Sequence, residues 1–307
     1  MQGGTNTTPS AKARKFHLRR WLDSVSSGWM MTCLCILMIF PLAIFLGLLL
    51  KGLPLLHQYS LWEIISGTVW SPMRGKFGFL PFIVSTLWVT LFSILVAAPV
   101  SVMAAIYITQ YAHKRTLTVM HTVIDILAGI PSVIYGVWGI LAIVPFVKTM
   151  SEYLGFKSTG YSILAGGIVL GIMCIPYILN MLIEVLRNIS MGLKEASLSL
   201  GATYWECIKT VILKKGLSGI LSAVGLGISK ALGETIAVLM VVGNQVQFPS
   251  NVFEAGYPIP ALIANNYGEM MSIPLYDSAL MFAALLLFVI VMVFNLAARF
   301  VINKSEV

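Results

Sequence analysis

Two oppositely charged residues, Lys230 and Glu234, lie in the middle of a long apolar stretch, residues 216–243. On a continuous helix, residues four apart share one face, so we expect these side chains to pair. A charge at the centre of a bilayer costs about 2.5–3.5 kcal/mol, so the pair must face the inside of a helix bundle or a wet cavity. A pair that only fixes the rotation of the helix is the structural alternative. Lysine before glutamate is the weaker order for helix stability, so helix stability alone does not explain the pair, and a functional role is favoured.

The composition indicates a membrane protein. Charged residues make up 10% and hydrophobic residues 58% of the 307 residues, whereas soluble domains carry roughly 25% charged residues, so a water-soluble enzyme is excluded. A helix that crosses a bilayer needs about 20 mostly apolar residues. Six stretches meet this requirement: 29–50, 79–109, 123–147, 161–183, 216–243 and 279–302. We therefore expect an all-α polytopic membrane protein with six transmembrane helices.

The basic residues set the expected orientation. With the N-terminus in the cytoplasm, 14 of the 20 lysines and arginines fall in cytoplasmic segments, five in outer loops, and Lys230 within the fifth span. Because positive charge is enriched in cytoplasmic loops, we expect both termini in the cytoplasm, and the net charge of +8 needs no nucleic acid. The expected organisation is a basic cytoplasmic tail over 1–28, a retained first transmembrane helix over 29–50, and a core of five transmembrane helices over 79–302.

The sequence between the fourth and fifth stretches is too long and too patterned for a simple linker. Ser190 can cap a helix that ends near Gly201, and Thr203 with Glu206 predicts a capping box for a second helix. Two interpretations remain open for residues 190–213: an amphipathic bracket on the membrane surface, or a docking element for a cytoplasmic protein. Recurring apolar residues favour docking: Leu193, Ala196, Leu200, Trp205, Ile208 and Ile212.

In this segment Glu195-Ala196 is followed by Gly201, and Val211 stands ten residues beyond the glycine. The spacing resembles the EAA loop of ABC importer permeases, which forms the helices that dock into the ATPase subunits. Three positions depart from the family's second Ala, its Ile and its Pro, namely Ser197, Val211 and Lys214. The resemblance implies a coupling role for five residues: Glu195, Ala196, Gly201, Thr203 and Glu206.

Residues 130–139, which include Tyr-Gly-Val-Trp-Gly, and residues 230–238, which begin Lys-Ala-Leu-Gly-Glu, are similar to the PstC family of phosphate importer permeases. The resemblance implies a type I ABC importer permease of MetI-like architecture that moves inorganic phosphate across the bacterial inner membrane by alternating access. The implied partners are a PstA-like permease subunit, two cytoplasmic ATPase subunits that use Mg-ATP, and an external phosphate-binding protein, which we expect to dock on the outer loops 52–78 and 244–277.

In the resembled family, an Arg and the Glu of the second segment are linked to phosphate passage. Lys230 stands in place of that Arg, which keeps the charge but loses the planar fork that can hold two phosphate oxygens. Our hypothesis is that Lys230 meets the anion while Glu234 holds Lys230 in the resting state. Ser132 and Tyr135 are weaker pathway candidates, because packing against the partner permease is the favoured interpretation of their segment.

No G-x-x-x-x-G-K-[ST] pattern occurs in the sequence, so we expect ATP hydrolysis in a separate subunit and neither cofactor nor metal in this chain. The four cysteines fit apolar packing positions. Three functions remain open: a phosphate importer permease, a permease for another oxyanion such as sulfate or molybdate, and a secondary transporter in which Lys230 and Glu234 relay protons.

Overall fold

The structure, a computed structural model, describes residues 9–268, 273 and 275–305. The chain divides into two units, residues 1–50 and 51–307. Helix α1 (Pro9–Gln58) fills the described part of the first unit and continues into the second. It contains an 18-residue window of mean hydropathy 2.9, which is apolar enough to cross a bilayer. The predicted first span lies inside this helix.

The second unit is built almost entirely from helices. Its elements include α2 (Leu61–Ser66), η1 (Pro72–Arg74), α3 (Leu80–Ile106), the π turn η2 (Tyr107–Tyr111), α4 (Lys114–Gly129), α5 (Ser132–Trp138), the π turn η3 (Gly139–Ile143), α6 (Val144–Tyr153), α7 (Ile163–Arg187), α11 (Leu217–Gly233), α12 (Ile236–Val241), α13 (Ile259–Asn266) and α14 (Tyr276–Ser305). Across the described residues, five helices are long and apolar enough to span a membrane, and a sixth is counted when the bent pair Tyr204–Lys215 and Leu217–Gly233 is taken as one span. The expected all-α membrane architecture is confirmed.

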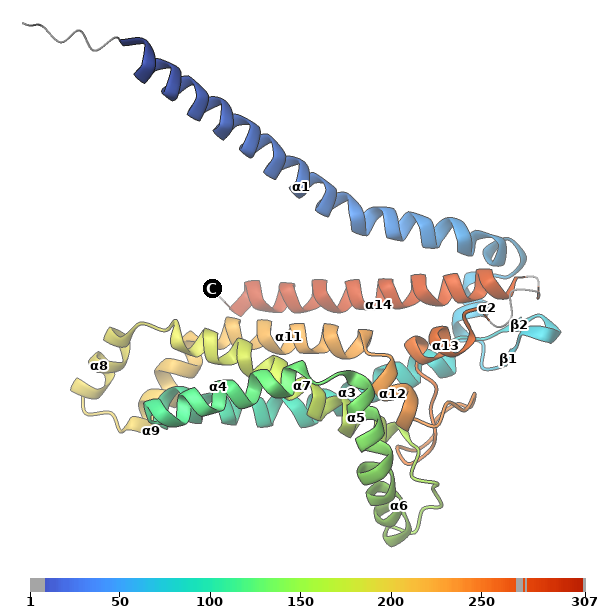
Figure 1. Cartoon of the computed structure of the whole chain (residues 1–307). Coiled ribbons are helices and arrows are strands. Elements are labelled where there is room, and N and C mark those ends of the chain that lie inside the picture. The colour runs from blue at the N-terminus through green and yellow to red at the C-terminus, as the bar shows by residue number, and fades with distance from the viewer. Residues whose placement is uncertain (1–8, 269–272, 274, 306–307) are drawn as a thin grey trace, which may run out of the picture. The chain divides into compact units, whose positions relative to one another are not determined.

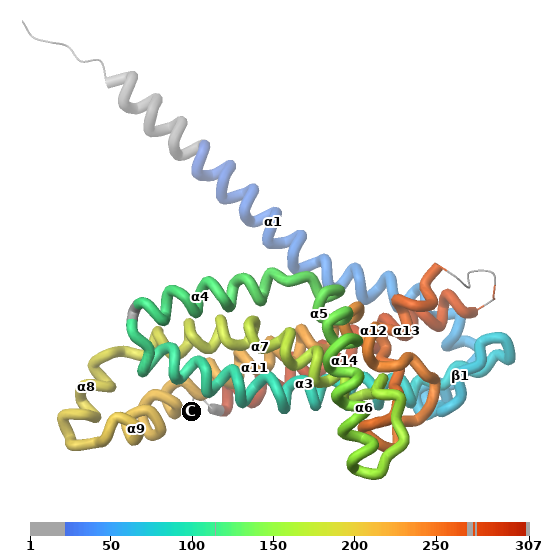
Figure 2. The backbone as a smooth tube through the Cα atoms, turned by 60° about the horizontal axis from the view of Figure 1, so that its bottom comes forward, coloured from blue at the N-terminus to red at the C-terminus, as the bar shows by residue number. Residues whose placement is uncertain are grey.

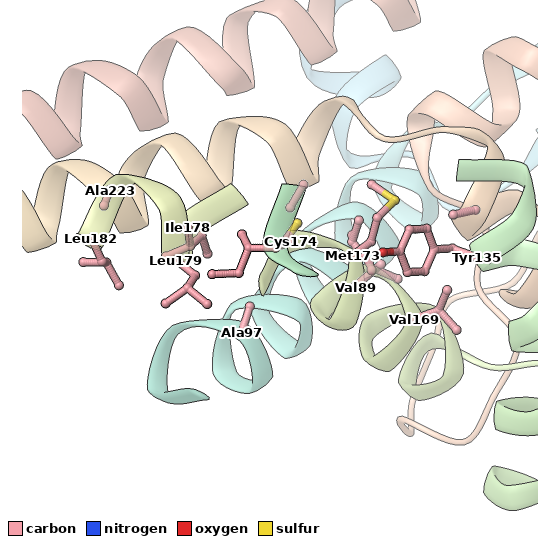
Figure 3. Close-up of a cluster of buried hydrophobic side chains, with 14 of the residues drawn as sticks. Val89, Ala97, Tyr135, Val169, Met173, Cys174, Ile178, Leu179, Leu182 and Ala223 are labelled. Carbon is pink, nitrogen blue, oxygen red and sulfur yellow. The ribbon is translucent and has the colours of Figure 1, made fainter. Parts of the chain in front are cut away.

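Helices α3 and α7 form the centre of the second unit, with α11 against both of them and α14 against α11 (Figure 1). Small residues permit this close approach. A Cβ placed on Gly167 of α7 would lie 2.5 Å from the Cβ of Phe92 on α3. Cys174 of α7 is fully buried within the same core cluster (Figure 3), as expected for an apolar packing position.

Two predicted spans are not continuous helices, so the ranges 123–147 and 216–243 are wrong as single elements. In the third stretch, α4 ends at Gly129 and a new helix begins at Ser132. Proline lacks an N–H and disfavours helical geometry in the residue before it, so Pro131 explains this break. The 22-residue helix Ser132–Tyr153 is the segment that qualifies as a span.

Two groups of short elements and loops lie at opposite ends of the second unit (Figure 2). At one end lie α13 and a hairpin of β1 (Trp70–Ser71) and β2 (Lys76–Phe77), paired antiparallel. The buried hydroxyls of Ser85 and Thr86 on α3 accept hydrogen bonds from the backbone nitrogens of Tyr257 and Ile259, which fix the chain before α13 to the span. At the other end lie α8 (Met191–Ser199), α9 (Tyr204–Cys207), the π turn η4 (Ile208–Ile212) and α10 (Leu213–Lys215).

Candidate functional site

The fifth span breaks between its two charged residues. Helix α11 ends at Gly233, Glu234 adopts an extended conformation (φ −76°, ψ 131°), and α12 begins at Ile236. The 17 residues of α11 rise by about 26 Å, less than the roughly 30 Å of a bilayer core, so α11 alone is shorter than the core. The carboxylate of Glu234 accepts a hydrogen bond from the backbone nitrogen of Ala237 at 3.5 Å. Glu234 thus lies just before the N-cap residue of α12, Thr235, instead of extending the face of α11.

The expected pair of Lys230 with Glu234 is therefore a wrong prediction. In the described part of the chain, no nitrogen–oxygen contact within 4.0 Å joins the two side chains. The Nζ of Lys230 instead lies 4.8 Å from the ring centroid of Tyr177 on α7, within the range of a cation–π interaction. All three side chains are half-buried. Lys230 and Glu234 both lie near enough to act electrostatically on the thiol of Cys174, one turn before Tyr177.

The second broken span packs against the first. A Cβ on Gly136 of α5 would lie 2.5 Å from the Sδ of Met240 on α12, so the segments that follow the two breaks are in direct contact, and they lie side by side in Figure 1. Of the weaker candidates, Ser132 is half-buried at the first position of α5. Tyr135 is buried, and its hydroxyl donates a hydrogen bond of 2.9 Å to the carbonyl of Leu127, which ties α5 back to α4.

The segment 190–213 forms two helices, as predicted. Ser190 occupies the N-cap position of α8, but its side chain makes no capping hydrogen bond. Gly201 follows the end of the helix with a φ of +87°, a conformation that glycine adopts without steric cost. Glu195 and Ala196 are both exposed on α8. Exposed apolar side chains accompany them: Leu193, Leu198, Leu200 and, from α9, Trp205.

The predicted capping box at the start of α9 is confirmed. The hydroxyl of Thr203 accepts a hydrogen bond from the backbone nitrogen of Glu206 at 3.3 Å, and the Glu206 carboxylate accepts one from the backbone nitrogen of Thr203 at 2.8 Å. The Thr203 hydroxyl also donates to this carboxylate at 2.7 Å. The hydrogen bond from the Thr203 side chain, and to a smaller degree the one from its backbone nitrogen, lower the pKa of Glu206. Both bonds stabilise the charged form of the carboxyl group.

Sequence reasoning missed Tyr177 as the partner of Lys230. The signal that points to it is a tyrosine directly after Pro176, deep inside an apolar helix, where an aromatic ring with a polar end is unusual among aliphatic neighbours. The sequence does not show the distance from Tyr177 to Lys230, because the two residues are 53 positions apart and meet only when α7 packs on α11.

Comparison with curated proteins gives close relatives over nearly the whole chain. The chain is 33% identical to the probable ABC transporter permease protein YqgH of Bacillus subtilis, with 98% of each chain covered. It is 31% identical to the phosphate transport system permease protein PstC of Haemophilus influenzae, with 96% of this chain and 98% of that protein covered. The PstC protein of Xylella fastidiosa strain Temecula1 is 35% identical, with 77% of each chain covered.

Two solved structures share the fold. The inward-facing MetNI methionine ABC transporter matches with a TM-score of 0.54 at 22% identity, covering 74% of this chain and 94% of that chain. A bacterial ABC transporter involved in the import of the acidic polysaccharide alginate matches with a TM-score of 0.54 at 18% identity, covering 93% and 99%. The family model of the binding-protein-dependent transport system inner membrane component matches residues 97–305. This chain belongs to that family of transport system inner membrane components.

Proposed function

We propose that this chain is a transmembrane permease subunit of an ATP-driven importer that translocates inorganic phosphate by alternating access. The observation that carries the proposal is Lys230, a half-buried cation beside a break in a membrane span, in a chain whose relatives at 31–35% identity include PstC phosphate permeases. A lysine ammonium binds phosphate as a point charge, and a fixed cation offsets the loss of water around an anion.

The geometry of the two breaks supports passage of an anion. A helix start carries partial positive charge from its free N–H groups, and transporters use broken helices to bring such ends to the substrate at membrane depth. The helix Ser132–Tyr153 and helix α12 both start after a break, and α12 packs against α5. The carboxylate of Glu234 already occupies the start of α12, so Lys230 and the start of the helix Ser132–Tyr153 are the groups that would stabilise phosphate on its way across.

The proposed assembly contains a PstA-like permease subunit, two ATPase subunits that bind Mg-ATP, and an external phosphate-binding protein. The exposed Glu195 and Ala196 of α8, and Leu200 directly after the helix, suit contact with the ATPase. The hairpin and α13 lie at the opposite end of the second unit (Figure 2), in the loops expected to receive the binding protein. We also propose that both termini are cytoplasmic, in the inner membrane of a bacterium.

The test is uptake of labelled phosphate by the complex reconstituted in proteoliposomes. We expect ATP-dependent, vanadate-sensitive accumulation that excess unlabelled phosphate abolishes and excess sulfate leaves intact. Inhibition by sulfate or molybdate as strong as that by phosphate would assign the chain to another oxyanion. Uptake that collapses with a protonophore while ATP stays high would instead identify an ion-coupled secondary transporter.

A further inference from the structure

Helix α8 is joined to a membrane span through the side chain of Lys194. The Nζ of Lys194 donates hydrogen bonds to the hydroxyl of Tyr204 at 2.6 Å and to the Oε1 of Gln110 at 3.2 Å. The Tyr204 hydroxyl in turn donates to the backbone carbonyl of Gln110. These three residues come from α8, α9 and the π turn η2, and we call them the Lys194 junction.

The surroundings of the Lys194 junction suit a fixed ammonium. Lys194 is half-buried, while its neighbours Leu193 and Glu195 are exposed. The Nζ also lies 4.4 Å from the ring centroid of Tyr204, a cation–π distance. Gln110 belongs to the last turn of the continuous helical segment Leu80–Tyr111, where carbonyls lack partners within the helix and positive charge is favourable.

Neighbouring contacts hold the junction on both sides. The ring of Tyr204 packs edge-on against Tyr111 of η2, with centroids 5.2 Å apart. The buried thiol of Cys207 donates a weak hydrogen bond to the Lys194 carbonyl at 3.8 Å. The Nε2 of Gln110 donates to the Thr109 hydroxyl at 3.2 Å, and that hydroxyl donates to the carbonyl of Ala105 on α3. A displacement of α8 therefore reaches the backbone of α3 through an unbroken series of polar contacts.

Two π turns lie next to the Lys194 junction. Gln110 lies within η2, and η4 directly follows α9. Single π turns are frequent at functional sites and mark places where a helix departs from its regular hydrogen-bond register. The Lys194 junction, with a π turn on either side of it, is therefore suited to transmit a movement of α8 to the span that ends in η2.

We propose that Lys194 is a positioning residue that transmits movement of the docking segment to the span α3. The inference rests on the proposed function, because the movement is the one that the ATPase subunits would impose on α8. Among the described residues, neither the exposed Glu195 nor Ala196 makes a side-chain hydrogen bond or ion pair to a span, whereas Lys194 joins the ATPase-facing surface of α8 to the membrane helices.

The first experiment measures the coupling ratio, phosphate transported per ATP hydrolysed, in proteoliposomes containing the full complex. Lys194→Met keeps the length of the side chain and removes its charge and donors. We expect the ratio to fall by at least about fivefold, the lower end of usual coupling between sites, while Lys194→Arg restores most of it. Lys215→Met removes an exposed lysine outside the segment 190–213 and should leave the ratio unchanged. A normal ratio in Lys194→Met, or an equal fall in Lys215→Met, would contradict the proposal.

A second measurement does not depend on phosphate. Hydrogen exchange of the full complex, with and without Mg-ATP and vanadate, reports movement in α8 and in η2. We expect nucleotide to change exchange in both segments of the wild type, and in α8 alone in Lys194→Met and Gln110→Leu. If the Lys194 variants do not assemble, Tyr204→Phe can be used, because it removes the bridging hydroxyl while keeping the ring. In this variant too, nucleotide should change exchange in α8 but not in η2. A wild type that accumulates no phosphate yet shows this linked change would refute the proposed function and leave the junction standing.

Discussion

The Nζ of Lys230 lies 4.8 Å from the ring centroid of Tyr177, and the carboxylate of Glu234, four residues further on, accepts a hydrogen bond from the backbone of a different helix. The cation is thus positioned by the face of an aromatic ring, which leaves its formal charge uncompensated by a carboxylate within 4.0 Å among the described residues. A lysine held in this way keeps more of its attraction for an anion than one locked in an ion pair, because no carboxylate oxygen is in contact with its ammonium group.

Replacement of Tyr177 tests this arrangement. Cation–π contacts contribute about 0.5–2 kcal/mol, so Tyr177→Leu is expected to lower kcat/KM for phosphate uptake by roughly two- to thirtyfold. Tyr177→Phe keeps the ring and should stay within about twofold of the wild type, which makes it the matched control. Equal losses in both variants would show that the hydroxyl, and not the ring face, matters.

Replacement of Lys230 tests the role of the cation itself. Hydrogen bonds to charged groups contribute about 1.5–3 kcal/mol, so Lys230→Ala is expected to reduce phosphate uptake by roughly 10- to 150-fold. Lys230→Arg retains the charge and adds a bidentate fork, so it should remain active. Initial rates of labelled phosphate uptake at matched amounts of complex decide the matter, and an unchanged rate in Lys230→Ala would rule out contact with the anion.

The two N-cap positions of the docking segment offer an internal comparison. Thr203 makes the side-chain capping bond of α9, whereas Ser190 makes none for α8. Loss of a working N-cap costs about 1 kcal/mol, so Thr203→Ala should raise hydrogen exchange across α9 and η4 about fivefold. Ser190→Ala should leave exchange in α8 close to that of the wild type. A larger effect from Ser190→Ala would contradict the assignment of the caps.

The capping box also predicts a pH dependence. The folded pKa of Glu206 is depressed by its hydrogen bonds from Thr203, so its contribution to the stability of α9 is present above the unfolded pKa and is lost as pH falls through the folded pKa. We expect the Glu206 carboxyl signal, followed by NMR in selectively labelled protein, to titrate below the ordinary range of glutamate. The Thr203→Ala variant should move the titration back up, and an unshifted titration in the wild type would disprove the capping box.

The contact between the two broken spans predicts a steric effect. A Cβ at Gly136 meets Met240, whereas a Cβ at Gly129 has no atom within 4 Å. Overpacking costs about 1–3 kcal/mol, so Gly136→Val is expected to lower the midpoint of thermal unfolding in detergent, while Gly129→Val should have little effect. Equal midpoints for the two variants would argue against close packing of α5 on α12.

The sequence was informative about most features that depend on local chemistry, although the side chain of Ser190 makes no capping bond and the helix break at Pro131 was not predicted. Apolar stretches located the spans around 79–109, 161–183 and 279–302, because the cost of exposing polar groups to lipid demands long apolar helices. The capping box of Thr203 and Glu206 and the helix end at Gly201 follow from residues within one turn of each other. The coupling roles of Glu195 and Ala196 remain predictions from the resemblance to the EAA loop.

The tertiary structure decided what depends on contacts between distant residues. Hydrophobicity alone does not distinguish a continuous span from a span that breaks inside the bundle, because apolar residues occur in both. The helix end at Gly233 was therefore not predicted. Once the helix breaks there, Lys230 and Glu234 no longer share a face. The packing of α7 on α11 then places Tyr177 beside Lys230. The sequence determined that a cation lies in the membrane, and only the packing of the helices decided which group holds it.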